Sequence, residues 1–142
     1  MIKFENVSVT YPGGVEALKD LNLEINDGDF IIIVGLSGAG KSTLLRTVNN
    51  LVKPSTGSVY LEDKNVTSAK KRELKQIRSQ IGMIFQTFNL VNRSTVLKNV
   101  LTGRLSNIST IRSILGLWPK DQKEMAFEAL NQVEILEKAY VR

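Results

Sequence analysis

Eight residues of this chain combine glycines with a lysine and a serine in an order that could bind phosphate. The run from Gly35 to Ser42 reads GLSGAGKS and matches the pattern G-x-x-x-x-G-K-[ST]. Glycines let the backbone curl so that consecutive N–H groups point inward at an anion. In such a loop Lys41 reaches the β- and γ-phosphates, and the Ser42 hydroxyl can ligate Mg²⁺. The predicted phosphate-binding residues are Gly35, Ser37, Gly38, Ala39, Gly40, Lys41, Ser42 and Thr43.

The segments on either side of this loop are those that must position it. Phe30 to Val34 is an unbroken apolar run of five residues, which is typical of a strand buried on both faces in a parallel sheet. After the loop, residues 41–51 carry leucine and valine at helical spacing, which predicts a helix with one buried side. That helix would begin at the phosphates and direct its positive N-terminal end at them.

Further strands and one more helix are predicted in the first 86 residues. Alternating or β-rich patterns and flanking turn residues predict strands over 2–11, 18–25, 58–61 and 81–85, and a polar helix over 68–80. Beyond Gln86 helices dominate, because apolar residues recur every three or four positions. One predicted helix starts near Val96 behind Ser94 or Thr95 as N-cap, a short one spans 111–118, and a longer one opens at Pro119.

Composition excludes several kinds of site. The 142 residues suit one domain, and they include no Cys and no His, so a disulfide framework, a thiolate zinc site and a histidine base are excluded. There is no apolar stretch of membrane-spanning length, and the N-terminus does not resemble a signal peptide. These features favour a cytosolic location.

The net charge of +5 has a local origin. Between residues 64 and 78 the chain carries one acidic residue, Glu73, and six basic ones, here called the basic strip: Lys64, Lys70, Lys71, Arg72, Lys75 and Arg78. The strip could contact nucleic acid or anionic lipid, or it could be a solvated helix face. Because no aromatic residues alternate with these charges, a base-stacking platform is not expected.

Around the glycine loop the sequence resembles ATPase subunits of ABC transporters. The leader ALKDLNLEINDGDFIIIVGLSGAGKSTLLRTVNNL and the later SQIGMIFQ carry this resemblance. It implies that Tyr11, ahead of Pro12-Gly13-Gly14, stacks on adenine. It also implies that Gln86 contacts Mg²⁺ or its bound water, takes part in catalysis with Lys41, and joins the nucleotide-binding core to a helical subdomain.

The resemblance covers the whole chain and narrows further in its second half. Three segments resemble those of phosphonate-import ATP-binding proteins: IGMIFQTFNLVNRSTVLKNVLTGRL, Trp118-Pro119-Lys120 and ALNQVEILEKAY. Amino-acid importers share much of this sequence. The family's signature sequence, second acidic motif and switch histidine do not occur in the chain. We therefore expect an N-terminal part of a longer subunit, which by itself would bind ATP but be inactive as an ATPase.

The resemblance also implies the architecture, the partners and the location. The expected fold is α/β, a P-loop NTPase of ABC type, with an antiparallel β-subdomain and part of a parallel core sheet over 1–86 and a helical subdomain over 87–142. The intact subunit would pair with a second ATPase subunit and dock on transmembrane permease subunits at the cytoplasmic face of the membrane. It would act indirectly with a substrate-binding protein, and no nucleic acid is expected as a partner. A permease helix would contact Phe88, Leu90, Val91 and Val96.

Two other functions remain open at this stage. The chain could bind nucleotide without catalysis, or it could belong to a DNA-associated ABC-type ATPase, as the basic strip would allow. Against the second, no sustained heptad segment follows Gln86. A GTPase is disfavoured because no Asn-Lys-x-Asp run is present to read guanine, and a small-molecule kinase because the chain has a two-strand leader.

Overall fold

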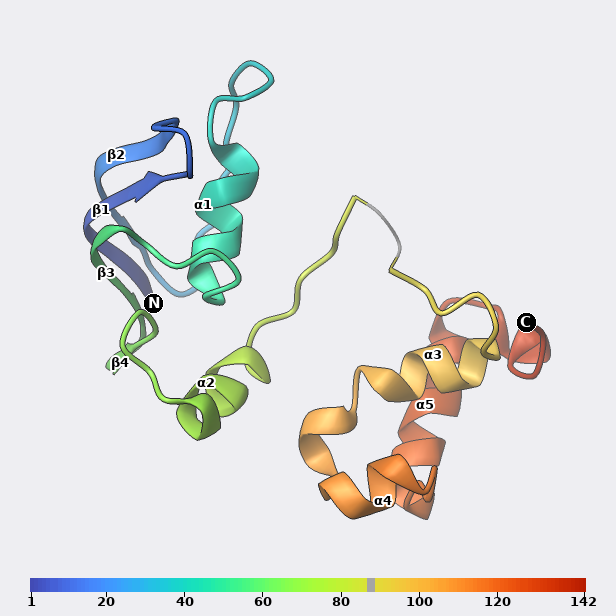
Figure 1. Cartoon of the computed structure of the whole chain (residues 1–142). Helices are drawn as coiled ribbons and strands as arrows, with labels where there is room; N and C mark the ends of the chain where they lie inside the picture. Colours follow the sequence, from blue (N-terminus) through green and yellow to red (C-terminus); the bar gives the residue numbers. More distant parts are fainter. Residues whose placement is uncertain (87–88) are drawn as a thin grey trace. The chain divides into compact units, whose positions relative to one another are not determined.

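The chain forms two units, Met1–Gly82 and Met83–Arg142. The computed structural model describes residues 1–142 except Thr87 and Phe88, and it leaves the side chain of Asn107 undescribed (Figure 1). The predicted division after Gln86 stays a prediction. The two units are described separately below.

An antiparallel sheet forms the base of the first unit. Its strands are β1 (Ile2–Thr10), β2 (Glu16–Ile25), β3 (Thr56–Leu61) and β4 (Lys64–Asn65), in the spatial order β2-β1-β3-β4. Each neighbouring pair is antiparallel, which confirms the predicted antiparallel part of the fold. The two-residue β4 was missed because it is too short to show any periodicity.

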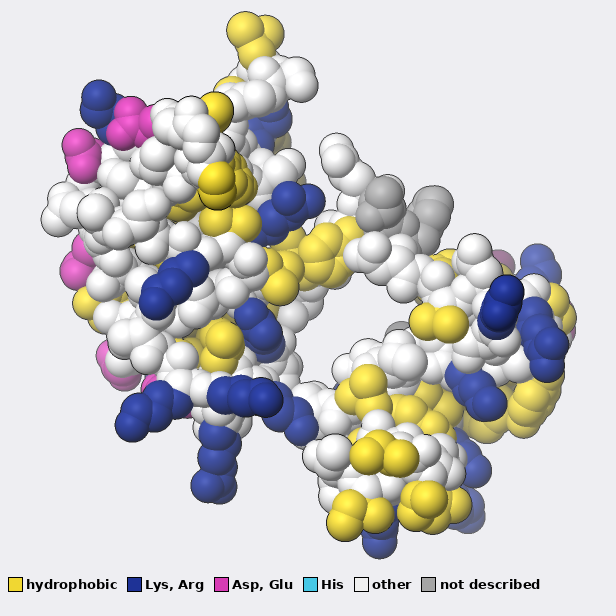
Figure 2. Space-filling model, viewed as in Figure 1, with side chains coloured by type: hydrophobic (Ala, Val, Ile, Leu, Met, Phe, Trp, Pro, Cys, Tyr) yellow, Lys and Arg dark blue, Asp and Glu magenta, His cyan; other side chains and the backbone are white. Residues whose placement is uncertain are grey.

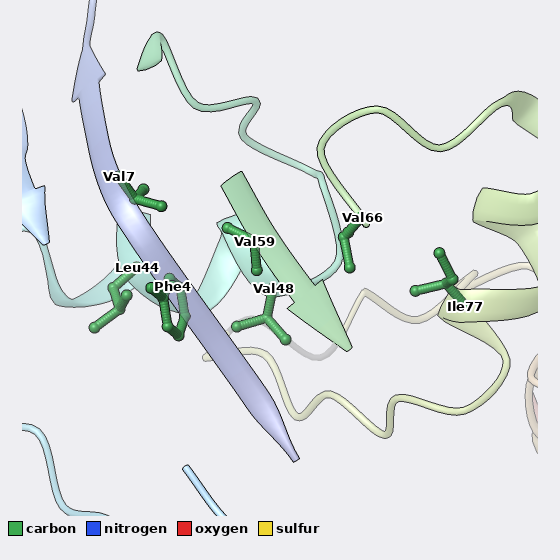
Figure 3. Close-up of a cluster of buried hydrophobic side chains, with 7 residues drawn as sticks. All are labelled: Phe4, Val7, Leu44, Val48, Val59, Val66 and Ile77. Atoms are coloured by element: carbon green, nitrogen blue, oxygen red, sulfur yellow. The ribbon is translucent and has the colours of Figure 1, made fainter. Parts of the chain in front are cut away.

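Two helices complete the core of this unit. The first is α1 (Lys41–Val48) and the second is α2 (Lys71–Arg78), both within the predicted ranges. Their apolar faces pack with the sheet in one cluster of buried side chains, drawn in Figure 3: Phe4, Val7, Leu44, Val48, Val59, Val66 and Ile77. Burying this much apolar surface is the main stabilising contribution to the unit, at about 25 cal/mol per Å².

The C-terminal end of α1 is closed by an asparagine in a left-handed conformation. Asn50 has φ 53°, its N–H donates to the carbonyl of Thr47 at 3.0 Å, and the Leu51 N–H donates to the carbonyl of Arg46 at 2.9 Å. This is the hydrogen-bond pattern of a Schellman motif, in which Asn replaces the usual Gly. The Asn50 side chain donates to the carbonyl of Val66 at 3.0 Å, which fixes the helix end to the segment that follows β4.

Neither predicted strand of the parallel core sheet is formed. Segments 30–34 and 81–85 have no strand assignment, and Phe30, Val34 and Ile84 are 87%, 84% and 100% exposed. A strand exists through hydrogen bonds to a neighbour, and within the described residues no strand lies beside either segment. Both apolar runs, predicted as buried strands, are largely exposed and have no neighbouring strand among the described residues.

The second unit is helical, as predicted. Its elements are α3 (Val96–Thr102), the 3₁₀ turn η1 (Leu105–Asn107), α4 (Thr110–Ile114), α5 (Lys120–Gln132) and the 3₁₀ turn η2 (Leu136–Lys138). Of the two predicted N-caps for α3, Thr95 is the one observed, since its side chain accepts from the Lys98 N–H at 3.3 Å. The core of the unit joins α3 and α5 through Leu97, Leu101, Ala126, Leu130 and Ala139. Among the described helices, none is long and apolar enough to cross a membrane.

The last residues of the chain return to the start of α3. The N–H groups of Val96 and Leu97 donate to the carbonyls of Val141 and Ala139, at 2.9 and 2.8 Å. The first N–H groups of a helix have no partner inside the helix. The C-terminal segment therefore supplies acceptors that α3 itself cannot provide.

Candidate nucleotide site

The glycine loop stands at the N-terminal end of α1 (Figure 1). Gly38 and Gly40 have φ values of 83° and 81°, both in the left-handed region. The Ala39 N–H donates to the carbonyl of Leu36 at 3.2 Å, and the Leu44 N–H starts the helix by donating to the carbonyl of Gly40 at 2.8 Å. Alternation of left-handed glycines with ordinary residues turns the backbone amides of a loop toward one side, which makes an anion-binding concavity.

Gly40 is also the point where the loop touches the sheet. A Cβ atom at this position would lie 2.2 Å from the carbonyl oxygen of Ala17 in β2. No side chain fits there, so the contact and the positive φ both require glycine. By contrast, a Cβ atom on Gly38 would meet nothing within 4 Å.

Lys41 folds back over its own loop. Its Nζ donates to the carbonyls of Gly35 and Leu36, each at 2.7 Å. The positive charge is thereby held at the loop, next to the helix N-terminus, where both favour an anion. Of the two following hydroxyl residues, Ser42 is exposed and Thr43 is buried at 8% exposure.

Tyr11 lies beside the start of α1. It follows β1 at the tight turn where the Gly14 N–H donates to the Tyr11 carbonyl at 3.1 Å. The phenol oxygen is 3.1 Å from the Oγ1 of Thr43, and either hydroxyl can donate. The side chain remains 36% exposed. The structure thus brings Tyr11 to the phosphate loop and shows that Thr43, predicted only as a loop residue, also holds the tyrosine.

Gln86 belongs to the other unit, and its side chain is exposed. Its predicted roles toward Mg²⁺ and in catalysis stay predictions. Among the described residues, no group of three or more His, Cys, Asp or Glu side chains could hold a metal ion.

The predicted docking residues that the structure describes lie in two different environments. Leu90 and Val91 are 61% and 56% exposed, whereas Val96 packs against the core of its own unit. Phe88 lies outside the described residues. Sequence analysis missed the role of Asn99, whose side chain accepts from the Val91 N–H at 2.9 Å and donates to the Val91 carbonyl at 3.3 Å. A pattern search cannot find this contact, because a lone Asn in a helix carries no periodic signal.

Three cations of the basic strip are exposed on α2, and a fourth donates hydrogen bonds to the backbone. Lys71, Arg72 and Lys75 of α2 are exposed, and Figure 2 shows Lys and Arg side chains gathered on the face of the first unit that carries this helix. Arg78 behaves differently, because its guanidinium is hydrogen-bonded to the backbone of the first unit.

Comparison with known proteins places this arrangement in a family. A family model described as "ABC transporter" matches residues 18–142. This chain belongs to the ABC transporter family. The match includes the glycine loop, α1, and everything that follows, so the predicted resemblance is confirmed.

Relatives of known name are similar along the entire chain. A phosphonates import ATP-binding protein of Bacillus cereus is 56% identical over 142 residues, which are 100% of this chain and 55% of the relative. A phosphonates import ATP-binding protein of Halalkalibacterium halodurans is 50% identical over the same length, again 55% of the relative. The chain thus spans about half the length of these curated relatives.

Solved structures confirm the fold. A dimeric bacterial ABC transporter cassette superposes with a TM-score of 0.83 at 35% identity, covering 99% of this chain and 60% of the cassette. A dimeric cassette in a post-hydrolysis state bound to ADP and Pi superposes with a TM-score of 0.81 at 33% identity, covering 99% and 62%. The predicted α/β P-loop fold of ABC type is therefore correct, although the two parallel strands are unpaired in this chain.

Proposed function

We propose that this chain is the ATP-binding region of an importer ATPase subunit that couples ATP hydrolysis to phosphonate uptake. The observation that carries the proposal is the arrangement at the start of α1. There the left-handed Gly38 and Gly40 shape the loop, the ammonium of Lys41 lies on it, and the ring of Tyr11 stands beside it. The phosphonate assignment is supported by the names of relatives at 50–56% identity.

The residues present fit a nucleoside triphosphate with Mg²⁺. The loop N–H groups and the N-terminal end of α1 would hold the β- and γ-phosphates, and Lys41 would exchange its two carbonyl acceptors for phosphate oxygens. The Ser42 hydroxyl would ligate Mg²⁺, which neutralises charge on the phosphates when bound, and the family resemblance makes the Gln86 amide the second proposed ligand. In the hydrolytic step, Lys41 and the loop amides stabilise the charge that spreads over the γ-phosphoryl oxygens as water attacks in line.

The same proposal sets the partners and the location. Two subunits would form a homodimer, and transmembrane permease subunits would anchor it at the cytoplasmic face of the membrane, with a substrate-binding protein acting through the permease. The exposed Leu90 and Val91 are the residues proposed to contact a permease helix. Crosslinking from Asn89 in a full complex checks this contact, and a complex without any crosslink to the permease argues against it.

Transport is the decisive test of the proposal. The corresponding N-terminal part of the Bacillus cereus relative would be replaced by this chain in cells that depend on that subunit for phosphonate uptake. We expect uptake of a radiolabelled alkylphosphonate to be retained, and to be lost with Lys41→Ala in the same chimera. Retained ATP-dependent uptake of an amino acid in place of the phosphonate would reject the substrate assignment while leaving the ATPase assignment intact.

A further inference from the structure

Arg78 connects the two helices of the first unit by a forked hydrogen bond. Its Nε donates to the carbonyl of Asn49 at 2.8 Å, and an Nη donates to the carbonyl of Asn50 at 3.0 Å. Arg78 is the last residue of α2, and the two asparagines directly follow the last residue of α1. The contact therefore joins the C-terminal ends of both helices.

The chemistry of this contact favours arginine in particular. The last carbonyls of a helix lack partners within the helix and carry its negative partial charge, so a cation is stabilised there. The planar guanidinium presents parallel donors that reach both carbonyls at once, whereas a lysine ammonium is a point charge on a flexible stem. One residue earlier, Ile77 is fully buried in the same cluster as Leu44 and Val48 of α1. Polar and apolar contacts thus hold α2 on α1 at adjacent positions.

We infer that Arg78 is a positioning residue of the nucleotide site, which transmits nucleotide binding from α1 to α2. This inference rests on the proposed function, because it takes ATP to bind at the N-terminal end of α1. The helix has eight residues, so its two ends are about 12 Å apart and move as one rigid body. Phosphate at one end restrains the whole helix, and Arg78 carries that restraint to α2.

A restraint on α2 would also affect the segment that follows it in the chain. The segment that leaves α2 begins with Ser79 and leads within a few residues to Gln86, which is predicted to contact Mg²⁺ and to take part in catalysis with Lys41. Arg78 makes polar contacts that connect the helix behind the phosphate loop with the start of this segment. Its loss should weaken ATP binding and uncouple α2 from the bound nucleotide.

Hydrogen exchange of the 142-residue chain, measured by mass spectrometry with and without Mg-ATP, tests the inference. In the parent chain we expect ATP to slow exchange both in the first turn of α1 and over residues 77–81. In Arg78→Gln we expect the slowing in α1 to persist, the slowing over 77–81 to disappear, and the Kd for ATP to rise about threefold to tenfold. The matched control is Arg72→Gln, which removes the same charge from an exposed position of the same helix and should behave like the parent.

The outcomes separate a positioning role from a structural one. A purely structural role would speed exchange over 77–81 in Arg78→Gln equally with and without ATP, and would leave the ATP-dependent difference intact, which overturns the inference. Protection of α1 without any effect over 77–81 in the parent also overturns it. Absence of ATP protection at α1 itself would instead reject the proposed function. Should Arg78→Gln fail to fold, Arg78→Lys keeps the charge without the fork, and it should show a reduced but measurable ATP effect over 77–81.

Discussion

The phenol oxygen of Tyr11 and the Oγ1 of Thr43 lie 3.1 Å apart, which joins the end of β1 to the first turn of α1. The contact fixes one edge of the aromatic ring and leaves the side chain 36% exposed beside the phosphate loop. A ring held in this way is available for stacking without having to be ordered by the ligand. Preorganisation of this kind lowers the entropic cost of binding.

Substitutions at Tyr11 should separate the contribution of its hydroxyl to folding stability from the contribution of its ring to ATP binding. Tyr11→Phe removes only the hydroxyl contact, so ATP affinity should stay near the parent value while the unfolding free energy falls by about 0.5–1.5 kcal/mol. Tyr11→Ala removes the stacking surface and should cost about 1–3 kcal/mol of ATP binding. Calorimetry measures both, with Tyr140→Ala, a tyrosine 74% exposed in the other unit, as the control. Stacking also predicts that GTP competes with ATP within about tenfold. Equal ATP affinities for Tyr11→Phe and Tyr11→Ala would place Tyr11 outside the site.

Removal of the Lys41 ammonium should weaken ATP binding strongly. Charge-assisted hydrogen bonds to phosphate contribute about 1.5–3 kcal/mol, so Lys41→Ala should raise the Kd for ATP about tenfold to a hundredfold. AMP, which lacks the β- and γ-phosphates, should bind almost equally to both forms. The control is Lys53→Ala, an exposed lysine beyond α1. If calorimetry finds the same ATP affinity for Lys41→Ala as for the parent chain, the glycine loop is not the phosphate-binding loop.

Gly38 and Gly40 form a matched pair for testing how the loop is held. Their φ values differ by only a few degrees, but only Gly40 faces a backbone atom, the Ala17 carbonyl oxygen at 2.2 Å from a would-be Cβ. Gly38→Ala should cost about 1–2 kcal/mol for the left-handed conformation alone. Gly40→Ala should cost about 1–3 kcal/mol more, because β2 or the loop must move. Urea unfolding measures both, and equal losses would mean that the loop does not rest on β2 in solution.

The exposed apolar segment 30–34 should make the chain self-associate. Its five residues lie between 37% and 87% exposed, and an apolar segment whose backbone N–H and C=O groups have no neighbouring strand is a template for other chains. Ile32→Lys introduces a charge in the middle of the segment and should shift sedimentation velocity profiles toward monomer. Val15→Lys is the control, since Val15 is similarly exposed at 63% but isolated in a turn. If both variants associate to the same extent, segment 30–34 does not cause the self-association.

Local patterns predicted the elements whose partners are close in sequence. The strands over β1 and β2 and the helices α1, α3 and α5 follow from periodicity, turn residues and N-caps, and each is present. The segments 30–34 and 81–85 were predicted as strands from their continuous apolar runs. A strand also requires a neighbouring strand, and the sequence of the segment itself does not show whether one is present. The glycine loop was predicted because its residues are contiguous. The contacts of Thr43 and Asn99 could not be, since each depends on a residue brought near by the fold.

The hydrogen bonds between residues 139–141 and the start of α3 join two segments that are synthesised at different times. The buried cluster of the first unit draws only on residues before 83, so its members are all available while the rest of the chain is still being made. Helix α3 emerges next, but the acceptors for its leading N–H groups, the carbonyls of Ala139 and Val141, are added only after α5. Until these residues are made, α3 has the Thr95 side chain as its N-cap but lacks both backbone acceptors. During that interval the start of α3 is less protected from proteases and chaperones than in the folded unit.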